Sequence, residues 1–376
     1  MALKQQSQQT IEFAITNKRD VLIDIVKGIG ILLVVFGHTN KGSVKDFIYL
    51  FHMPLFFYLS GSTFSLSKNK CDKYDIKYDI VKRMRSLLIP YFLFSVISFV
   101  YWLKIELLFR PINYSSIFEG KIGELSIPLQ QFINIFVSKL SPGETPFVYN
   151  SPLWFLTCLF VSIVCYTIVK KYTGKYSLFF CCLGASLFFS LLRDVQLPWC
   201  FEIALTTLPL LWLGDMTYKR IKTSTSLEVF FISIVSLIIC TSIVLEFNPS
   251  ISMMAHKFGT WWQFYLCSVS LIVLLLVIGR FVSRFNSGVL QWLGRNSLII
   301  MCVHGPINRI VLFAVSVIIQ KDVSVIRNSL LMSSCVVLLV IIIIIPIVIV
   351  INRYLPWVLG RKKTNKKVSN SYEVKM

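Results

Sequence analysis

The chain has 376 residues, of which 55% are hydrophobic and only 15% are charged, whereas roughly a quarter of the residues in a soluble domain are charged. Its net charge of +20 would suit a nucleic-acid-binding protein, but the positive residues lie in alternate connections between long apolar stretches, as in inner-membrane proteins. Most of the ten cysteines lie inside those stretches, and no Cys/His spacing is typical of a metal site. We therefore expect neither nucleic acid nor a metal ion as a partner.

In chain order, about ten apolar stretches are long enough to cross ~30 Å of hydrocarbon, where only helices satisfy their own backbone hydrogen bonds. They lie at residues 21–39, 46–66, 87–104, 152–170, 176–192, 199–217, 226–246, 261–282, 296–318 and 329–351. The sequence therefore predicts an all-α fold, a polytopic membrane helix bundle of about ten transmembrane helices.

Lysine and arginine residues indicate how this bundle is oriented. Roughly two thirds of the 38 lie in segments on the same side as both chain ends, and the positive-inside rule assigns that side to the cytoplasm. We expect a cytoplasmic N-terminal segment at 1–20, a transmembrane domain at 21–352, and a basic cytoplasmic tail at 353–376 that contacts anionic lipids.

The longest outer connection spans residues 105–151. Within it, the segment 129–140 (LQQFINIFVSKL) places five apolar residues on one helical face: Leu129, Phe132, Ile133, Phe136 and Leu140. This pattern predicts either an interfacial helix, or one that dips into the bundle, or a lid that packs over it.

The first span carries three ionisable residues, Asp24, Lys27 and His38. Such residues in a bilayer usually face the bundle interior or a water-filled cavity. Lys27 and His38 are related by only ~20° of rotation and ~16 Å of rise in an ideal helix. Asp24 shares that face and can pair with Lys27 at i, i+3. The span therefore predicts a polar stripe along an interior path, and the alternative is a snorkelling lysine with its counter-ion and an interfacial histidine.

An imidazole and a fixed cation at the two ends of one stripe suit acyl transfer. A neutral imidazole takes the proton of an attacking hydroxyl, or accepts the acyl group transiently. A cation holds phosphates or neutralises developing charge.

Five segments together resemble a known family. They are KGIGILLVVFGH (27–38), FHMPLFFYLSG (51–61), RMRSLLIPY (83–91), SPLWFL (151–156) and WLGRNSLIIMCVHGPI (292–307). In this order they resemble the acyltransferase-3 family of integral membrane O-acyltransferases, whose first helix carries a basic residue and a histidine with the spacing of Lys27 and His38. The chain ends soon after its last predicted span, so it resembles the stand-alone members that acetylate polysaccharide or fucose.

The resemblance implies that His38 is the catalytic residue and that Lys27, with Asp24 beside it, lies near the acyl donor, acetyl-CoA. Family members often show an Arg-x-x-Arg pair before the third helix. Here the pattern departs, because Lys82 and Arg85 have that spacing while Arg83 does not. Which of these three residues binds the donor phosphates is therefore open, and the alternative is that they serve only the positive-inside rule.

Four further residues are candidates for substrate binding: His52, Glu202, His304 and Arg309. His52 precedes a proline near a kink, where freed backbone can line a cavity, and His304 matches a histidine of the family. Glu202 and Arg309 are charged groups inside predicted spans, where they need partners. For each of the four, a structural role is the alternative.

Together these features predict a multi-pass protein of the bacterial inner membrane that transfers acetyl from acetyl-CoA to a hydroxyl of a cell-surface or lipid-linked glycan. Two alternatives stay open. The intramembrane charges would also serve a transporter or flippase of a lipid-linked sugar, and a glycan polymerase would need no acyl donor.

Overall fold

The computed structural model describes residues 19–67, 76–109, 126–138, 149–192, 197–246, 251–285 and 287–361. Most of the N-terminal segment, the greater part of the long outer connection and most of the basic tail lie outside these described residues. Within them the chain is helical throughout, apart from connections and one isolated β-bridge between Ser252 and Lys257. The prediction of an all-α bundle is confirmed.

Every predicted span coincides with helical structure. The helices are α2 (Val21–Thr39), α3 (Ser43–Tyr49), α4 (His52–Ser67), α5 (Ile76–Phe109), α6 (Ser126–Val137), α7 (Trp154–Tyr172), α8 (Lys175–Leu191), α9 (Phe201–Thr206), α10 (Leu208–Thr223), α11 (Ser226–Glu246), α12 (Trp261–Val282), α13 (Gly288–Arg295), α14 (Ser297–Ile319), α15 (Val323–Asn328) and α16 (Leu330–Tyr354), with short 3₁₀ turns at Ser151–Leu153, Pro198–Cys200 and Pro356–Leu359.

Seven helical segments among the described residues, with α3 and α4 taken together, are long and apolar enough to cross a membrane. Helix α8 is apolar but shorter, and the predicted sixth span is broken into α9 and α10. The protein is therefore a multi-pass membrane bundle, while the number of about ten spans and the cytoplasmic position of both termini stay predictions.

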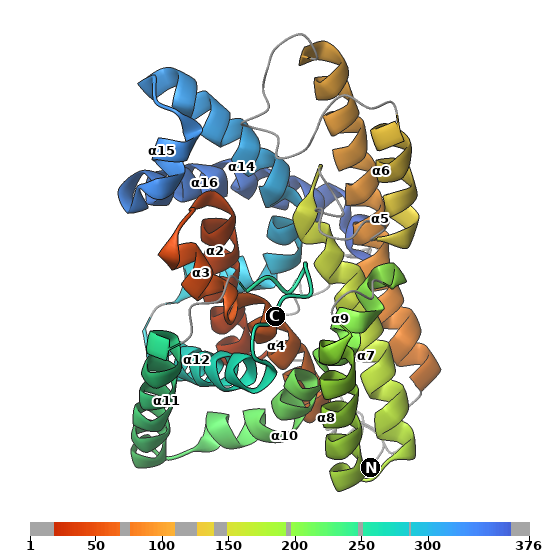
Figure 1. Ribbon diagram of the computed structural model, residues 1–376, viewed down its shortest axis with the longest axis vertical. Coiled ribbons are helices and arrows are strands. Elements are labelled where there is room, and N and C mark those ends of the chain that lie inside the picture. The colour runs from red at the N-terminus through yellow and green to blue at the C-terminus, as the bar shows by residue number, and fades with distance from the viewer. Residues whose placement is uncertain are drawn as a thin grey trace, which may run out of the picture.

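Helix α2 lies inside the bundle and contacts α4, α12, α13, α14 and α16 (Figure 1). It begins where the Asp20 carboxylate accepts hydrogen bonds from two backbone N–H groups of the first turn, at 3.0 and 3.3 Å, as an N-cap does. The first two turns touch α13 backbone to backbone. A Cβ on Gly294 would lie 1.8 Å from the carbonyl oxygen of Asp24, so only glycine allows this approach.

Two prolines lie within helices that contact α2, and a polar side chain binds the carbonyl that each proline leaves free. Proline lacks the N–H that would bond the carbonyl four residues earlier. For Pro54 that carbonyl belongs to Leu50, and the Ser268 hydroxyl of α12 donates to it at 2.6 Å. For Pro306 the carbonyl belongs to Cys302, and the side-chain amide of Asn150 donates to it at 2.8 Å. These bonds allow irregular backbone deep in an apolar bundle.

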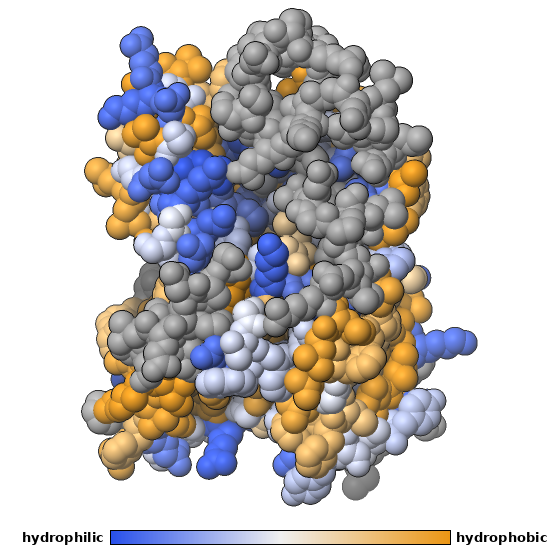
Figure 2. All heavy atoms as spheres, in the orientation of Figure 1, coloured by the Kyte–Doolittle hydropathy of each residue, from blue (hydrophilic) through white to orange (hydrophobic). Residues whose placement is uncertain are grey.

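Large apolar side chains remain exposed on the outer faces of α8, α11, α14 and α16. They include Phe180, Ile238, Ile318 and Leu331, which are 60–78% exposed. Figure 2 shows hydrophobic residues along the margins of one face of the molecule and hydrophilic residues nearer its middle. Exposed apolar surface of this extent marks contact with lipid.

Helix α6 confirms that the outer connection contains a helix, although it begins three residues before the predicted segment. Its apolar face points away from the bundle, because Phe132 and Phe136 are exposed while Gln131, Asn134 and Ile135 are buried. The Tyr91 hydroxyl of α5 donates to the carbonyl of Ile135 at 2.9 Å. The exposed face fits lipid, and the choice between an interfacial helix and a lid over the bundle stays a prediction.

Candidate active site

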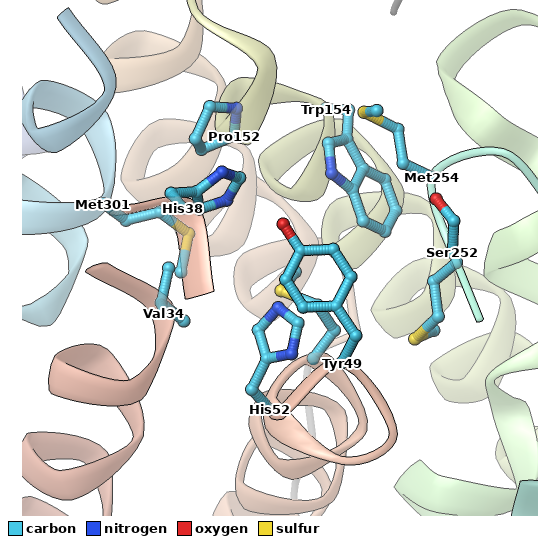
Figure 3. A pocket seen from close by; sticks show the side chains of 11 residues that line it. Val34, His38, Tyr49, His52, Pro152, Trp154, Ser252, Met254 and Met301 are labelled. Atoms are coloured by element: carbon cyan, nitrogen blue, oxygen red, sulfur yellow. The ribbon is translucent and has the colours of Figure 1, made fainter. Parts of the chain in front are cut away.

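A pocket opens at the C-terminal end of α2, where the break between α3 and α4 brings two helix ends together (Figure 3). Its walls come from five parts of the chain. The lining residues are Val34, His38, Tyr49, His52, Met53, Pro152, Trp154, Ser252, Met253, Met254 and Met301. The pocket is mostly apolar, with an imidazole from each of two helices and a phenol and an indole facing it.

The α2 face that lines this pocket is the face predicted from the sequence. Val34 and His38 are one turn apart and both reach the pocket. Lys27 lies about two turns before Val34 and is rotated from it by only ~20°. The helix therefore carries Lys27 and the pocket-lining residues on one side.

Three of the four histidines in the chain converge at this pocket. The ring centroids of His38 and His304 are 5.2 Å apart, and the Tyr49 ring lies 6.2 Å from His38 and 4.8 Å from His52. His52 and His304 are buried, whereas His38 is only partly buried and lines the pocket. The structure thus brings together His38, His52 and His304, which the sequence had nominated separately.

Hydrogen bonds to the backbone fix the tautomer of two of these rings. His52 Nδ1 lies 2.8 Å from the Ile48 carbonyl oxygen, and His304 Nδ1 lies 3.0 Å from the Ile300 and Met301 carbonyl oxygens. A carbonyl oxygen only accepts, so Nδ1 carries the proton in both rings and each Nε2 keeps its lone pair. In His304, Nε2 is buried and has no hydrogen-bond partner among the described residues.

The last carbonyls of α2, which have no partners inside the helix, are bound from two directions. The Arg327 guanidinium of α15 donates to the carbonyl of Thr39 at 3.1 Å and to that of His38 at 3.3 Å. The Asn308 amide of α14 also donates to the His38 carbonyl at 3.3 Å and accepts from the Thr39 hydroxyl at 3.0 Å. These contacts fix the helix turn that carries His38.

At the other end of α2 the charges pair differently from the prediction. Asp24 Oδ2 lies 3.5 Å from Arg295 Nε on α13, whereas the described residues include no ion pair between Asp24 and Lys27. The close ion-pair partner of Asp24 is therefore Arg295, which the Gly294 contact brings to it, while Lys27 interacts with Asp24 electrostatically at longer range. Lys27 lies within electrostatic range of Asp24, Arg83 and Arg19.

Of the three basic residues before the third predicted span, Arg83 is the one that turns into the bundle. Its Nη2 donates to the Thr63 hydroxyl at 3.1 Å and its guanidinium lies 5.8 Å from the Phe64 ring centroid. Lys82 and Arg85 are exposed. Lys170 also lies against Phe64, with its ammonium 4.9 Å from the ring centroid. The same ammonium is paired with the Asp215 carboxylate.

Glu202 and Arg309 do not line the pocket. The Glu202 carboxylate is fully buried and accepts from the backbone N–H of Leu197 at 3.0 Å, which holds the turn before α9. Arg309 is half-buried and lies within electrostatic range of Tyr101 on α5. Neither residue is therefore among those that line the pocket with His38 and His52.

Sequence reasoning missed Tyr49, Asn308 and Arg327. Tyr49 follows directly from the helix break that Pro54 causes, so the F-H-M-P pattern was a usable signal for it. Asn308 lies one turn after His304 on the same helix face, which was a weaker signal. Nothing in the sequence around Arg327 distinguishes it from an ordinary loop arginine.

The comparison with protein families decides the identity. The model of the acyltransferase-3 family, described as an acyltransferase domain, matches residues 20–353. The chain belongs to this acyltransferase family. The match covers every helix from α2 to the end of α16 apart from the final residue of α16, and no curated protein and no solved structure matches the chain. This protein is thus a multi-pass membrane acyltransferase.

Proposed function

We propose that this acyltransferase moves an acetyl group from cytoplasmic acetyl-CoA to a hydroxyl of a cell-surface or lipid-linked glycan, in the bacterial inner membrane. The observation that carries the proposal is the pocket at the end of α2. There His38 meets two further histidines, Tyr49 and Trp154, while basic residues gather near the opposite end of the same helix.

The donor end of the site is the group formed by Lys27, Arg83 and Arg19. These three cations outnumber the one carboxylate beside Lys27, that of Asp24, so the group has a net positive charge that attracts an anion. The phosphates of a coenzyme A thioester supply such an anion, and guanidinium groups bind phosphate through paired N–H donors. At the other end of α2, Tyr49 and Trp154 in the His38 pocket offer flat apolar surfaces with polar edges, which suit the sugar ring of the acceptor.

His38 serves the reaction in either of two ways. As a general base it takes the proton of the glycan hydroxyl while that oxygen attacks the thioester carbonyl, the carbon–sulfur bond breaks, and the imidazolium returns the proton to the thiolate of coenzyme A. As a nucleophile it first accepts the acetyl group on a ring nitrogen with release of the thiolate. The glycan hydroxyl then attacks the acetyl carbonyl, the carbon–nitrogen bond breaks, and the hydroxyl proton passes to the imidazole and from it to the thiolate. Both routes conserve atoms and charge.

The experiment that tests the proposal follows labelled acetyl. Inverted membrane vesicles from cells that produce the protein are incubated with acetyl-CoA labelled in the acetyl group, and the glycan fraction is counted. The expected result is label in glycan with matching release of coenzyme A, and none in vesicles that lack the protein. Movement or extension of glycan without release of coenzyme A would contradict the proposal and favour a flippase or a polymerase.

A further inference from the structure

His304 has an unusual environment for a buried histidine. Its side chain is fully buried, its Nδ1–H is bonded to two backbone carbonyls of its own helix, and its Nε2 has no partner among the described residues. A buried acceptor without a donor is destabilising, because it has lost its hydrogen bond to water and gained none. An atom left in this state is expected to gain a donor at some stage of the protein's work.

The ring that faces His304 is His38, with centroids 5.2 Å apart and planes inclined by 54°. At that separation a small side-chain rotation brings a nitrogen of each ring to hydrogen-bond distance. The His38 ring has no hydrogen bond among the described residues, although its backbone is held by Asn308 and Arg327. The neighbouring imidazole, His52, instead lies against Tyr49.

The two rings are complementary because only one of them is fixed. His304 presents a lone pair whose direction its backbone bonds determine, and a neutral His38 has one N–H to donate and one lone pair. Donation to His304 leaves the other His38 nitrogen unprotonated, and a partner on the second nitrogen is what sets the tautomer of a working imidazole. The arrangement parallels the acceptor that orients the histidine of a catalytic triad.

We propose that His304 is a positioning residue whose Nε2 accepts the ring N–H of His38 and thereby directs the free lone pair of His38 toward the reacting groups. When His38 gains a proton or an acetyl group, its N–H stays bonded to His304, which stabilises the positive ring in an apolar pocket. This inference rests on the proposed function for its kinetic test, but not for its chemical one.

Two amide substitutions separate this role from a purely structural one. His304→Gln places its side-chain oxygen near the position of Nε2 and so retains an acceptor for His38. His304→Asn retains a donor near the position of Nδ1 for the backbone carbonyls but offers His38 nothing. Ser162→Ala is the matched control, because this buried hydroxyl bonds to Ala204 and Thr207 away from the pocket.

The kinetic test measures labelled acetyl transfer to vesicle glycan over a range of acetyl-CoA concentrations. We expect His304→Asn to lower kcat on the order of 100-fold with KM for acetyl-CoA within about threefold of wild type. His304→Gln should recover about a tenth of wild-type kcat or more, and Ser162→Ala should stay near wild type. Equal losses in both amide variants with a lowered melting temperature, or full activity in His304→Asn, would overturn the inference.

The chemical test needs no acetyl-CoA. Diethylpyrocarbonate reacts with the lone pair of a neutral imidazole, and mass spectrometry measures the rate of modification at His38. We expect this rate to fall several-fold in His304→Asn and to be largely retained in His304→Gln. An unchanged modification rate in His304→Asn would overturn this inference and leave the proposed function standing. If the modification rates are as expected but the wild type transfers no acetyl group, only the proposed function is overturned.

Discussion

Replacing Arg327 by alanine should impair catalysis from outside the pocket. The guanidinium binds the carbonyls of Thr39 and His38, at 3.1 and 3.3 Å, and these are the last two residues of α2. Without it, both carbonyls lose their charged donor, but Asn308 still donates to the His38 carbonyl at 3.3 Å, so only the Thr39 carbonyl is left without a side-chain donor. A hydrogen bond from a charged group contributes ~1.5–3 kcal/mol, and the loss of a cation at a helix C-terminus adds ~0.3–1 kcal/mol.

A local loss of this size loosens the last turn of α2 without unfolding the bundle. Displacement of a reacting group by ~1 Å costs up to about 100-fold in rate, so Arg327→Ala should lower kcat between about 10-fold and 100-fold. KM for acetyl-CoA should stay within about twofold of wild type, since the proposed donor-binding cations lie near the far end of the helix.

The assay is labelled acetyl transfer by purified protein in nanodiscs, together with the melting temperature. Arg327→Lys keeps the charge but not the two-pronged geometry and should lose less than the alanine variant. Lys321→Ala is the control, because Lys321 is exposed in the same connection. An Arg327→Ala enzyme with kcat near wild type, or one changed only in KM, would refute the reasoning.

Two further predictions concern donor binding and helix packing. Arg83→Ala should raise KM for acetyl-CoA about tenfold, which corresponds to the loss of one charge-assisted hydrogen bond. Lys82→Ala removes an exposed lysine and should change KM less than threefold. Equal effects of the two variants in an acetyl-CoA titration would contradict a specific role for Arg83. Gly214→Ala would place a Cβ 2.0 Å from the Tyr58 carbonyl oxygen and should destabilise the protein by about 1–3 kcal/mol. Gly184→Ala meets nothing within 4 Å and should not lower the melting temperature, because alanine favours the helix more than glycine does.

Periodicity made much of this site predictable. Lys27, Val34 and His38 share a helix face because 3.6-residue geometry fixes their angular positions once the span is helical. The proline two residues after His52 indicated where irregular backbone would line a cavity, whereas His304 was a candidate through the family resemblance. Apolar length likewise predicted the helices themselves.

Contacts between distant elements were not predictable in the same way. The partner of Asp24 is Arg295 because Gly294 allows α13 to touch α2, and only the packed structure reveals that approach. Arg327 acts on α2 from a short helix that precedes α16, and no local pattern marks an arginine that caps another helix. Glu202 was a candidate for substrate binding because it is a charged residue inside a predicted span. In the structure its buried carboxylate accepts a hydrogen bond from the nearby backbone N–H of Leu197, a local role that the sequence does not distinguish from substrate binding.

In the proposed mechanism the imidazole of His38 performs the acyl transfer. The most direct measurement compares purified wild type with His38→Gln in nanodiscs, at saturating labelled acetyl-CoA and with added native membrane glycan. We expect acetylated glycan to form only with the wild type, while both proteins retain the same melting temperature and the same affinity for acetyl-CoA. Acetylated glycan produced by His38→Gln at the wild-type rate would contradict this mechanism.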